Sequence, residues 1–222
     1  MCNIDTEAII RLWNSTDEAD WIRTATYDYM QQVLHHNPNN GNLENYMDNL
    51  NVEPVLANSE SFFTFLHDRL FPWKFSQGNI LEANLNRLNA MNAVNREYAY
   101  NRMRELCHSL NGLCTNDIYQ SDLIYNALSI HNYIDGMGVA CASGMLSVMF
   151  PRLFGTVDRF VRISLCAAGI MEPTANPECD IDIDEAVRME NIMIGKSLSF
   201  ENENITPRVI DKALWTMGHD RD

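Results

Sequence analysis

The sequence predicts an all-α protein, arranged as a single domain of two lobes. Apolar residues recur every three or four positions along most of the chain, as in residues 19–36, which is the spacing of one helix face. Helix start signals precede several of these stretches, and Thr206 followed by Pro207 is a clear example. Residues 156–169 are short and apolar-rich, so their pattern fits either a strand or a helix.

The periodic stretches place the expected helices along the chain. They cover residues 6–14, 19–36, 59–71, 80–110 (as two helices), 121–134, 139–150, 181–198 and 206–218. The Asn-, Gly- and Pro-rich residues 37–54 are expected to be a loop or a lobe boundary, and Pro72 is expected to end the helix before it. We expect residues 60–165 to form a central lobe, and residues 1–59 and 166–222 to pack together as the second.

The charge of the chain bears on its partners. A net charge of −14 disfavours nucleic acid, because binding to phosphates requires Lys and Arg. The excess lies in the flanks, however, since residues 60–165 carry nine basic and nine acidic residues. A neutral segment can still gather a local positive patch, so DNA binding by this segment remains open.

Composition also bears on location and cofactors. The chain has no run of about 18 apolar residues and no basic-then-apolar start, so we expect a cytoplasmic protein without a membrane partner. The six cysteines form no CxxC pair and have no metal-ligand spacing with histidine. Free thiols are therefore expected, with no metal and no cofactor, and the sequence does not indicate an oligomeric state.

Two closely spaced glycines, Gly136 and Gly138, stand in the sequence DGMGVACASGML before an expected helix. Such a turn can be a plain connection between helices, with glycine in the left-handed conformation. It can also bring backbone N–H groups at the helix start close to a phosphate, where the helix dipole adds to the attraction.

The chain here resembles the helix-hairpin-helix DNA glycosylase superfamily, in the branch that includes endonuclease III. The family hairpin L-P-G-[VI]-G-x-K-T-A is similar to IDGMGVACA, and its V-D-[TV]-[HR]-V motif is similar to VDRFV within TVDRFV. Asp158 follows Ala140 by 18 residues, the separation expected in this branch. The resemblance implies a two-lobed helical fold of this glycosylase type, with double-stranded DNA as the partner.

The resemblance also implies roles for individual residues. Asp158 would be catalytic, stabilising the sugar cation or activating water as the glycosidic bond breaks. The phosphate-binding residues would be Gly136, Gly138, Ala140, Arg159 and Arg162. Ala140 stands where bifunctional members carry a lysine nucleophile, so no lyase activity is expected. The family's iron–sulfur cysteines are absent, and the chain would be a divergent member.

A loop that probes the DNA opposite the target base is the role implied for Trp73, Lys74, Phe75 and Gln77. The competing interpretation is that these aromatic residues belong to the core, although Lys74 favours a surface loop because burying its charge is costly. For Asp158 the competing interpretation is a helix N-cap, a position that Asp favours.

The expected function is monofunctional base excision, in which the N-glycosidic bond of a modified or mismatched base is hydrolysed. The alternative is a catalytically inactive module of the same fold that binds DNA or another protein, since fold alone does not decide function.

Overall fold

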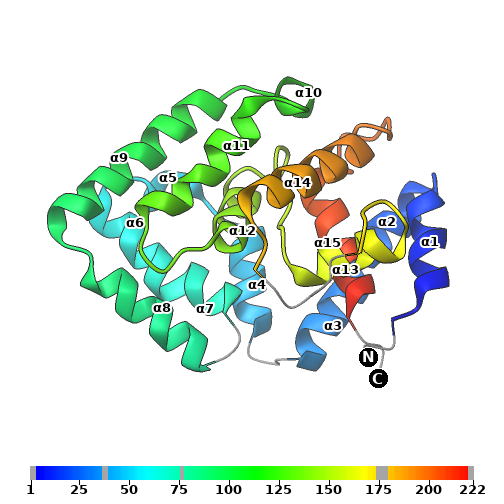
Figure 1. Cartoon of the computed structure of the whole chain (residues 1–222), viewed down its shortest axis with the longest axis horizontal. Helices are drawn as coiled ribbons and strands as arrows, with labels where there is room; N and C mark the ends of the chain where they lie inside the picture. Colours follow the sequence, from blue (N-terminus) through cyan, green and yellow to red (C-terminus); the bar gives the residue numbers. More distant parts are fainter. Residues whose placement is uncertain (1–3, 37–39, 76–77, 174–179, 220–222) are drawn as a thin grey trace.

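The computed structural model describes residues 4–36, 40–75, 78–173 and 180–219, and all regular secondary structure in these ranges is helical (Figure 1). The prediction of an all-α protein is therefore confirmed. No helix in these ranges is both long and apolar enough to cross a lipid bilayer.

Most of the helices are α-helices, and three short segments, labelled η, have π or 3₁₀ geometry. In chain order they are α1 (Thr6–Asn14), α2 (Glu18–Arg23), the π-helix η1 (Thr24–Asp28), α3 (Tyr29–His36), α4 (Asn40–Asp48), α5 (Val52–Val55), α6 (Ser59–Phe65), the π-helix η2 (Leu66–Leu70), α7 (Phe71–Lys74), α8 (Gly78–Ala90), α9 (Ala93–Leu110), α10 (Thr115–Ile118), α11 (Asp122–Leu128), the 3₁₀-helix η3 (Ser129–Tyr133), α12 (Val139–Met149), α13 (Arg159–Ala167), α14 (Ile183–Ser197) and α15 (Pro207–Gly218).

Several sequence predictions of helices are confirmed. Residues 80–110 divide into two helices, α8 and α9. The ambiguous segment 156–169 is helical as α13, and not a strand. Thr206 caps α15 by accepting a hydrogen bond from the Val209 N–H. Local capping signals therefore located these elements well.

The Asn-rich stretch 37–54, expected to be a loop or a lobe boundary, is not a loop. Residues 40–48 and 52–55 form α4 and α5, and residues 37–39 lie outside the described ranges. The stretch is weakly helix-forming, but Glu44 and Met47 are buried on one side of α4. Tertiary contacts of these side chains therefore outweigh the low local propensity.

Pro72 does not end its helix, contrary to the sequence prediction. The helical path runs from Ser59 through the π-helix η2 and α7 to Lys74, with Pro72 at the start of α7. Proline removes one backbone N–H and crowds the preceding turn. The wide π turn directly before Pro72 alters the hydrogen-bond ladder at that point, which allows the helix to continue.

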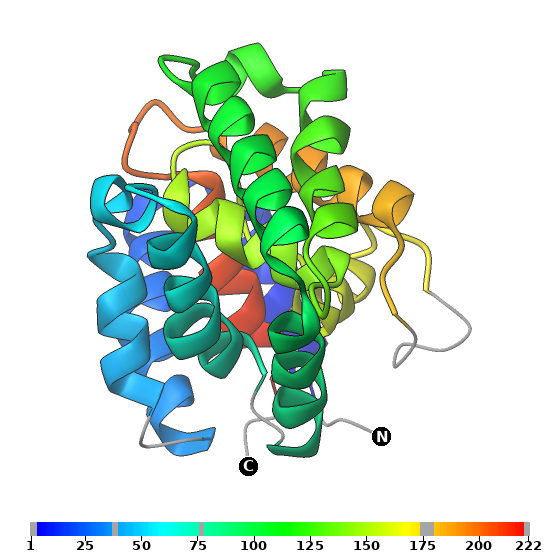
Figure 2. The same ribbon diagram turned by 90° about the vertical axis from the view of Figure 1, so that its left-hand side faces the viewer.

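The buried side chains form two hydrophobic clusters. We call them the terminal cluster and the central cluster. The helices of the central cluster lie mostly to the left of α12 in Figure 1, and the same helices face the viewer in Figure 2. The terminal cluster takes residues from α1, α2, η1, the last residue of α9, α10, α11, α13, α14 and α15, and the central cluster from α4 to α9 and η3. α12 contributes Leu146 to the first and Met145 to the second, so it belongs to both cores.

The two clusters do not follow the expected lobe boundaries along the chain, because α10 and α11, within residues 60–165, pack in the terminal cluster. Met47 and Val55 pack in the central cluster, although they precede residue 60. Val161 and Leu165 pack in the terminal cluster, although they precede residue 166. The segment between α12 and α13 therefore passes from one core to the other.

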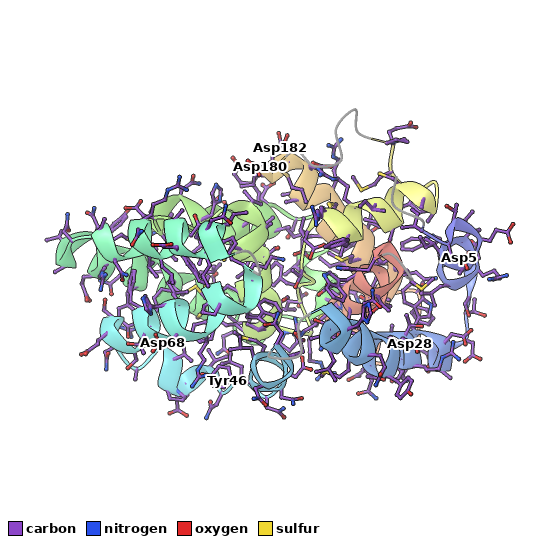
Figure 3. All side chains as sticks on the ribbon, turned by 90° about the horizontal axis from the view of Figure 1, so that it is seen from below. Asp5, Asp28, Tyr46, Asp68, Asp180 and Asp182 are labelled. Carbon is purple, nitrogen blue, oxygen red and sulfur yellow. The ribbon has the colours of Figure 1, made fainter. Side chains whose placement is uncertain are left out.

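The acidic side chains labelled in Figure 3 lie at the periphery. Asp5 and Asp28 lie at the end built by α1 to α3, and Asp68 lies at the opposite end in η2. Asp180 and Asp182 lie beside α14. The labelled part of the negative charge is therefore away from α12, the helix shared by both cores.

Gly136 combines a left-handed backbone conformation with a close backbone neighbour. Its φ is +85°, and an added Cβ would lie 2.5 Å from the backbone oxygen of Asn84. Gly112 also has a positive φ, +78°, but an added Cβ there would meet nothing within 4 Å.

This contrast predicts the cost of two alanine substitutions. Gly112→Ala should lower the free energy of unfolding by about 1–2 kcal/mol through backbone strain alone. Gly136→Ala should lower it by about 1–3 kcal/mol more, because the clashing atom is backbone and cannot rotate away. Urea unfolding of both variants measures the difference. Equal costs would show that α8 does not press on the turn.

Candidate functional site

The predicted hairpin connects η3 to α12. The Met137 side chain is buried, and its N–H donates to the Ile134 carbonyl at 3.1 Å, which closes the turn. Gly138 is exposed and is the N-cap of α12, with φ −82° and ψ 171°. Because glycine has no side chain, no side chain caps the start of α12. The backbone N–H groups at the start of this buried helix are therefore not covered by a capping side chain.

Four backbone amides at this turn are open. The N–H groups of Gly136, Gly138, Val139 and Ala140 have no hydrogen-bond acceptor among the described residues. Every helix start leaves such donors, and an anion can satisfy them with help from the helix dipole. The hairpin therefore has the donor groups that a phosphate contact requires.

The segment 155–158, which we call the strap, leads from α12 to α13. The N–H of Gly155 donates to Glu190 Oε2 of α14 at 3.0 Å. The N–H of Thr156 is hydrogen-bonded to Asp211 of α15. Both carboxyl groups are buried, with Glu190 0% and Asp211 3% exposed. Two acidic side chains thus hold consecutive amides of the strap.

The strap is also bound to α12. The N–H of Val157 donates to Ser143 Oγ at 2.9 Å, and the Ser143 hydroxyl lies 3.3 Å from the Val157 carbonyl oxygen. Thr156 Oγ1 lies 2.8 Å from the hydroxyl of Ser147. These contacts place Asp158, the next residue, beside the helix that the hairpin begins.

Asp158 is the N-cap of α13. Its Oδ1 accepts from the N–H groups of Phe160 at 2.9 Å and Val161 at 3.1 Å. Its Oδ2 lies 3.5 Å from Lys74 Nζ, and the two side chains are 17% and 12% exposed, respectively. The alternative that Asp158 is a helix N-cap is therefore confirmed, with Oδ1 in the cap and Oδ2 facing Lys74.

The region expected to probe DNA is packed inward instead. Trp73 and Lys74 end α7, and Trp73 Nε1 donates to the buried Glu44 Oε2 at 2.6 Å. Phe75 packs edge-on against Phe71. Gln77 lies outside the described residues. Lys74 does not lie in a surface loop, because pairing with Asp158 offsets the cost of burying its charge.

Gly144 explains how α7 comes so close to α12. A Cβ at this position would lie 3.1 Å from the Trp73 ring and 3.6 Å from Lys74 Cδ. Only a residue without a side chain leaves room for both. The Lys74 stem therefore crosses α12 one turn after Ala140 and directs its amine to Asp158.

The two arginines predicted to bind phosphate differ. Arg159 is exposed, and its guanidinium lies 4.6 Å from the centre of the Phe160 ring. Arg162 is 1% exposed and pairs with Glu185 at 3.3 Å. The expectation that Arg162 contacts DNA is wrong, because its guanidinium is inside the terminal cluster.

A buried network of charges joins α4 to α15. Arg208 Nη2 lies 3.3 Å from Glu44 Oε1 and 3.0 Å from Asp48 Oδ1, and its Nη1 donates to Ser147 Oγ at 3.0 Å. Lys212 Nζ lies 3.1 Å from Glu44 Oε1 and 2.6 Å from Asp48 Oδ1. We call Glu44, Asp48, Arg208 and Lys212 the seam network, because it links the two clusters.

Burial changes the acidity of the groups that hold the strap. Desolvation raises the pKa of Asp211 to about 7, against the opposing effect of Arg208. Desolvation also raises the pKa of Glu190 well above its usual value, and Asp211 adds to this effect. Removal from water disfavours the charged form of a carboxyl group, so both side chains favour their protons.

Sequence reasoning missed Glu190 and Asp211, although a signal was present. Glu190 lies within the apolar stripe of α14, next to Met189 and one turn before Met193 and Ile194. Asp211 interrupts the stripe of α15 in the same way. A charged residue at a core position of an amphipathic helix indicates a buried polar contact.

No family model, curated protein or solved structure matches this chain.

The seam network predicts a strong effect of removing Arg208. Arg208→Met leaves Glu44 buried with only Lys212 as a cation, and breaking a buried pair costs about 3–5 kcal/mol. Arg152→Met is the control, since Arg152 and Glu203 form an exposed pair whose loss should cost less than about 1 kcal/mol. Chemical unfolding of both variants measures the two costs. Similar small costs would show that the seam network does not hold the clusters together.

Proposed function

We propose that the protein binds double-stranded DNA through the hairpin and acts as a monofunctional DNA glycosylase, in a two-lobed fold of the helix-hairpin-helix glycosylase type. The observation that carries this proposal is the arrangement about α12. The open amides of Gly136 and Gly138 begin this helix, and the strap returns Asp158 to its side. Amides able to bind a phosphate thus begin α12, and the carboxylate that begins α13 is held beside the same helix.

The chemistry assigned to Asp158 follows from what N-glycosidic hydrolysis needs. The target base must leave the helical stack, at a cost of a few kcal/mol, before its bond is reached. Positive charge then develops on the sugar, and a nearby carboxylate stabilises it or activates water. Oδ1 of Asp158 is occupied in capping α13, so Oδ2 is the oxygen for this task.

Lys74 restrains that oxygen. Its amine lies 3.5 Å from Oδ2, at the long end of a hydrogen bond, so an approaching sugar has only a weak contact to displace. Ala140 provides no nucleophile on α12, and the proposal therefore includes hydrolysis without strand cleavage.

A catalytically inactive module that binds DNA or a protein is the second candidate. The specific observation in its favour is that Asp158 already has partners for both oxygens, two backbone amides and Lys74. A carboxylate used entirely for structure would leave the hairpin as a binding element alone. The two candidates share the hairpin and differ in the role of Asp158.

Gly138→Asp tests the hairpin with two opposed readouts. An Asp at this N-cap can accept a hydrogen bond from the first turn of α12, so stability should rise by about 0.3–1 kcal/mol. The same carboxylate would repel a phosphate, since two unit charges 4 Å apart repel by about 1 kcal/mol even in bulk water. Duplex binding should weaken at least about fivefold.

Fluorescence anisotropy with a labelled duplex, at fixed salt, measures this binding next to a thermal melt. Asn116→Asp on α10 is the control, because it adds the same charge at another helix start. If Gly138→Asp raises stability and leaves affinity equal to that of the control, the hairpin is a plain turn and the DNA proposal fails.

Asp158→Asn separates the two candidates. Asn caps a helix nearly as well as Asp, so the melting temperature should change little. Base release should fall by on the order of a hundredfold if the charge stabilises the sugar cation, while duplex binding persists. The assay is single-turnover base release from duplexes that carry damaged or mismatched bases, followed by alkaline cleavage.

Asp182→Asn is the matched control, because Asp182 caps α14 through the Glu185 N–H at 2.8 Å. It should leave both base release and binding unchanged. Full activity of Asp158→Asn would remove Asp158 from the chemistry. Binding without base release in the unsubstituted protein, over the whole panel of bases, would favour the module.

A further inference from the structure

Glu190 and Asp211 meet at one glycine of the strap. The Gly155 N–H bonds to Glu190 Oε2 at 3.0 Å, and a Cβ on Gly155 would lie 3.0 Å from Asp211 Cβ and 2.8 Å from Met193 Cε. The strap is therefore pressed directly onto α14 and α15. Both acidic side chains are buried. Apolar residues of similar size could fill the same space.

Each of the two acids has one oxygen without a partner. Glu190 Oε1 and Asp211 Oδ2 are buried and accept no hydrogen bond from the described residues. A buried ionised carboxylate with an unsatisfied oxygen is strongly disfavoured. A carboxyl group that keeps its proton avoids that penalty, because the neutral form loses far less hydration on burial.

Burial and the neighbouring charges disfavour two ionised carboxylates. Arg208 on α15 and Lys74 on α7 lower the pKa of Asp211, whereas Asp158 raises it. Arg208 already pairs with Glu44 and Asp48. Lys74 already pairs with Asp158. The Tyr29 hydroxyl is a further titratable group near Asp211. The pKa of Glu190 is raised in part by the charge of Asp211.

We propose that Glu190 and Asp211 are positioning residues that hold one proton between them at neutral pH, and that this proton fixes the strap that presents Asp158. The protonated pair accepts the hydrogen bonds of Gly155 and Thr156 without placing two negative charges under the strap. Loss of the proton creates two adjacent buried charges, which draw in water and loosen the strap. The catalytic part of this inference rests on the proposed function, whereas the proton and the strap do not.

The proton gives stability a defined pH dependence. Burial raises the pKa of Asp211 to about 7, whereas an Asp in an unfolded chain has a pKa near 3.9. The folded state thus binds more protons than the unfolded state between these values. Stability from this group is complete below about pH 4 and is lost as pH rises through about 7.

The experiment uses the full chain and needs no substrate. Side-chain carboxyl NMR of the unsubstituted protein from pH 5 to 9 should show at least one of the two groups protonated at pH 7. Amide exchange of residues 155–157, relative to unstructured peptide at each pH, should lose protection above about pH 7. Two carboxylates ionised at pH 6, or protection that does not change with pH, would overturn the proposal.

Two substitutions at Glu190 distinguish a proton from mere packing. Glu190→Gln keeps an acceptor for the Gly155 N–H, so strap protection should persist to pH 9, and unfolding at pH 7 should release about one proton less. Glu190→Leu removes the acceptor and should lower protection at every pH. Glu201→Gln, at an exposed site, is the control and should match the unsubstituted protein. Unchanged pH dependence in Glu190→Gln would refute the shared proton.

The same samples separate this inference from the proposed function. If base release occurs, its rate should fall above about pH 7 in the unsubstituted protein and remain level in Glu190→Gln. If no base is released while the carboxyl signals and strap protection behave as described, the glycosylase proposal fails and the proton remains. If base release occurs and its rate depends on pH in Glu190→Gln as it does in the unsubstituted protein, Glu190 does not position Asp158.

Discussion

Three consecutive backbone amides, those of residues 155–157, are buried between helices and need acceptors that water cannot supply. α14, α15 and α12 each provide one, through Glu190, Asp211 and Ser143. A buried N–H left without an acceptor costs about 1–3 kcal/mol. This requirement explains why two acidic residues occupy core positions of otherwise apolar helices, and it fixes the point where the chain leaves α12 for α13.

Burial of these acidic residues has a further consequence for the charges around them. Buried negative charge needs cations or protons nearby, and Arg208, Lys212 and Lys74 supply the cations at the seam between the two clusters. Glu44 is another buried acid at this seam. Its contacts stabilise α4 in a stretch of low helix propensity. A polar constraint in one short segment thus determines how the central and terminal clusters meet, because hydrophobic packing alone does not fix direction.

Local patterns were enough to predict the helices whose caps and apolar faces are encoded nearby, such as α8, α9 and α15. They failed at α4 and at Pro72, where a buried ion pair and a preceding π turn decide the outcome. For the candidate site, the resemblance singled out Asp158 and the hairpin glycines. It could not show that Lys74 turns inward or that Arg162 is buried, because both facts depend on partners distant in the sequence.

Two of the three acceptors of the strap amides, Glu190 and Asp211, follow it in the chain. α15, which holds Thr156, also packs against α1, α2, η1 and α3, so the terminal cluster joins segments from both sides of the central one. During synthesis the strap leaves the ribosome before α14 and α15 exist, so the amides of Gly155 and Thr156 remain hydrated until these helices arrive. The central cluster, made of segments closer in sequence, can fold first, and closure of the terminal cluster follows as the slower, non-local event.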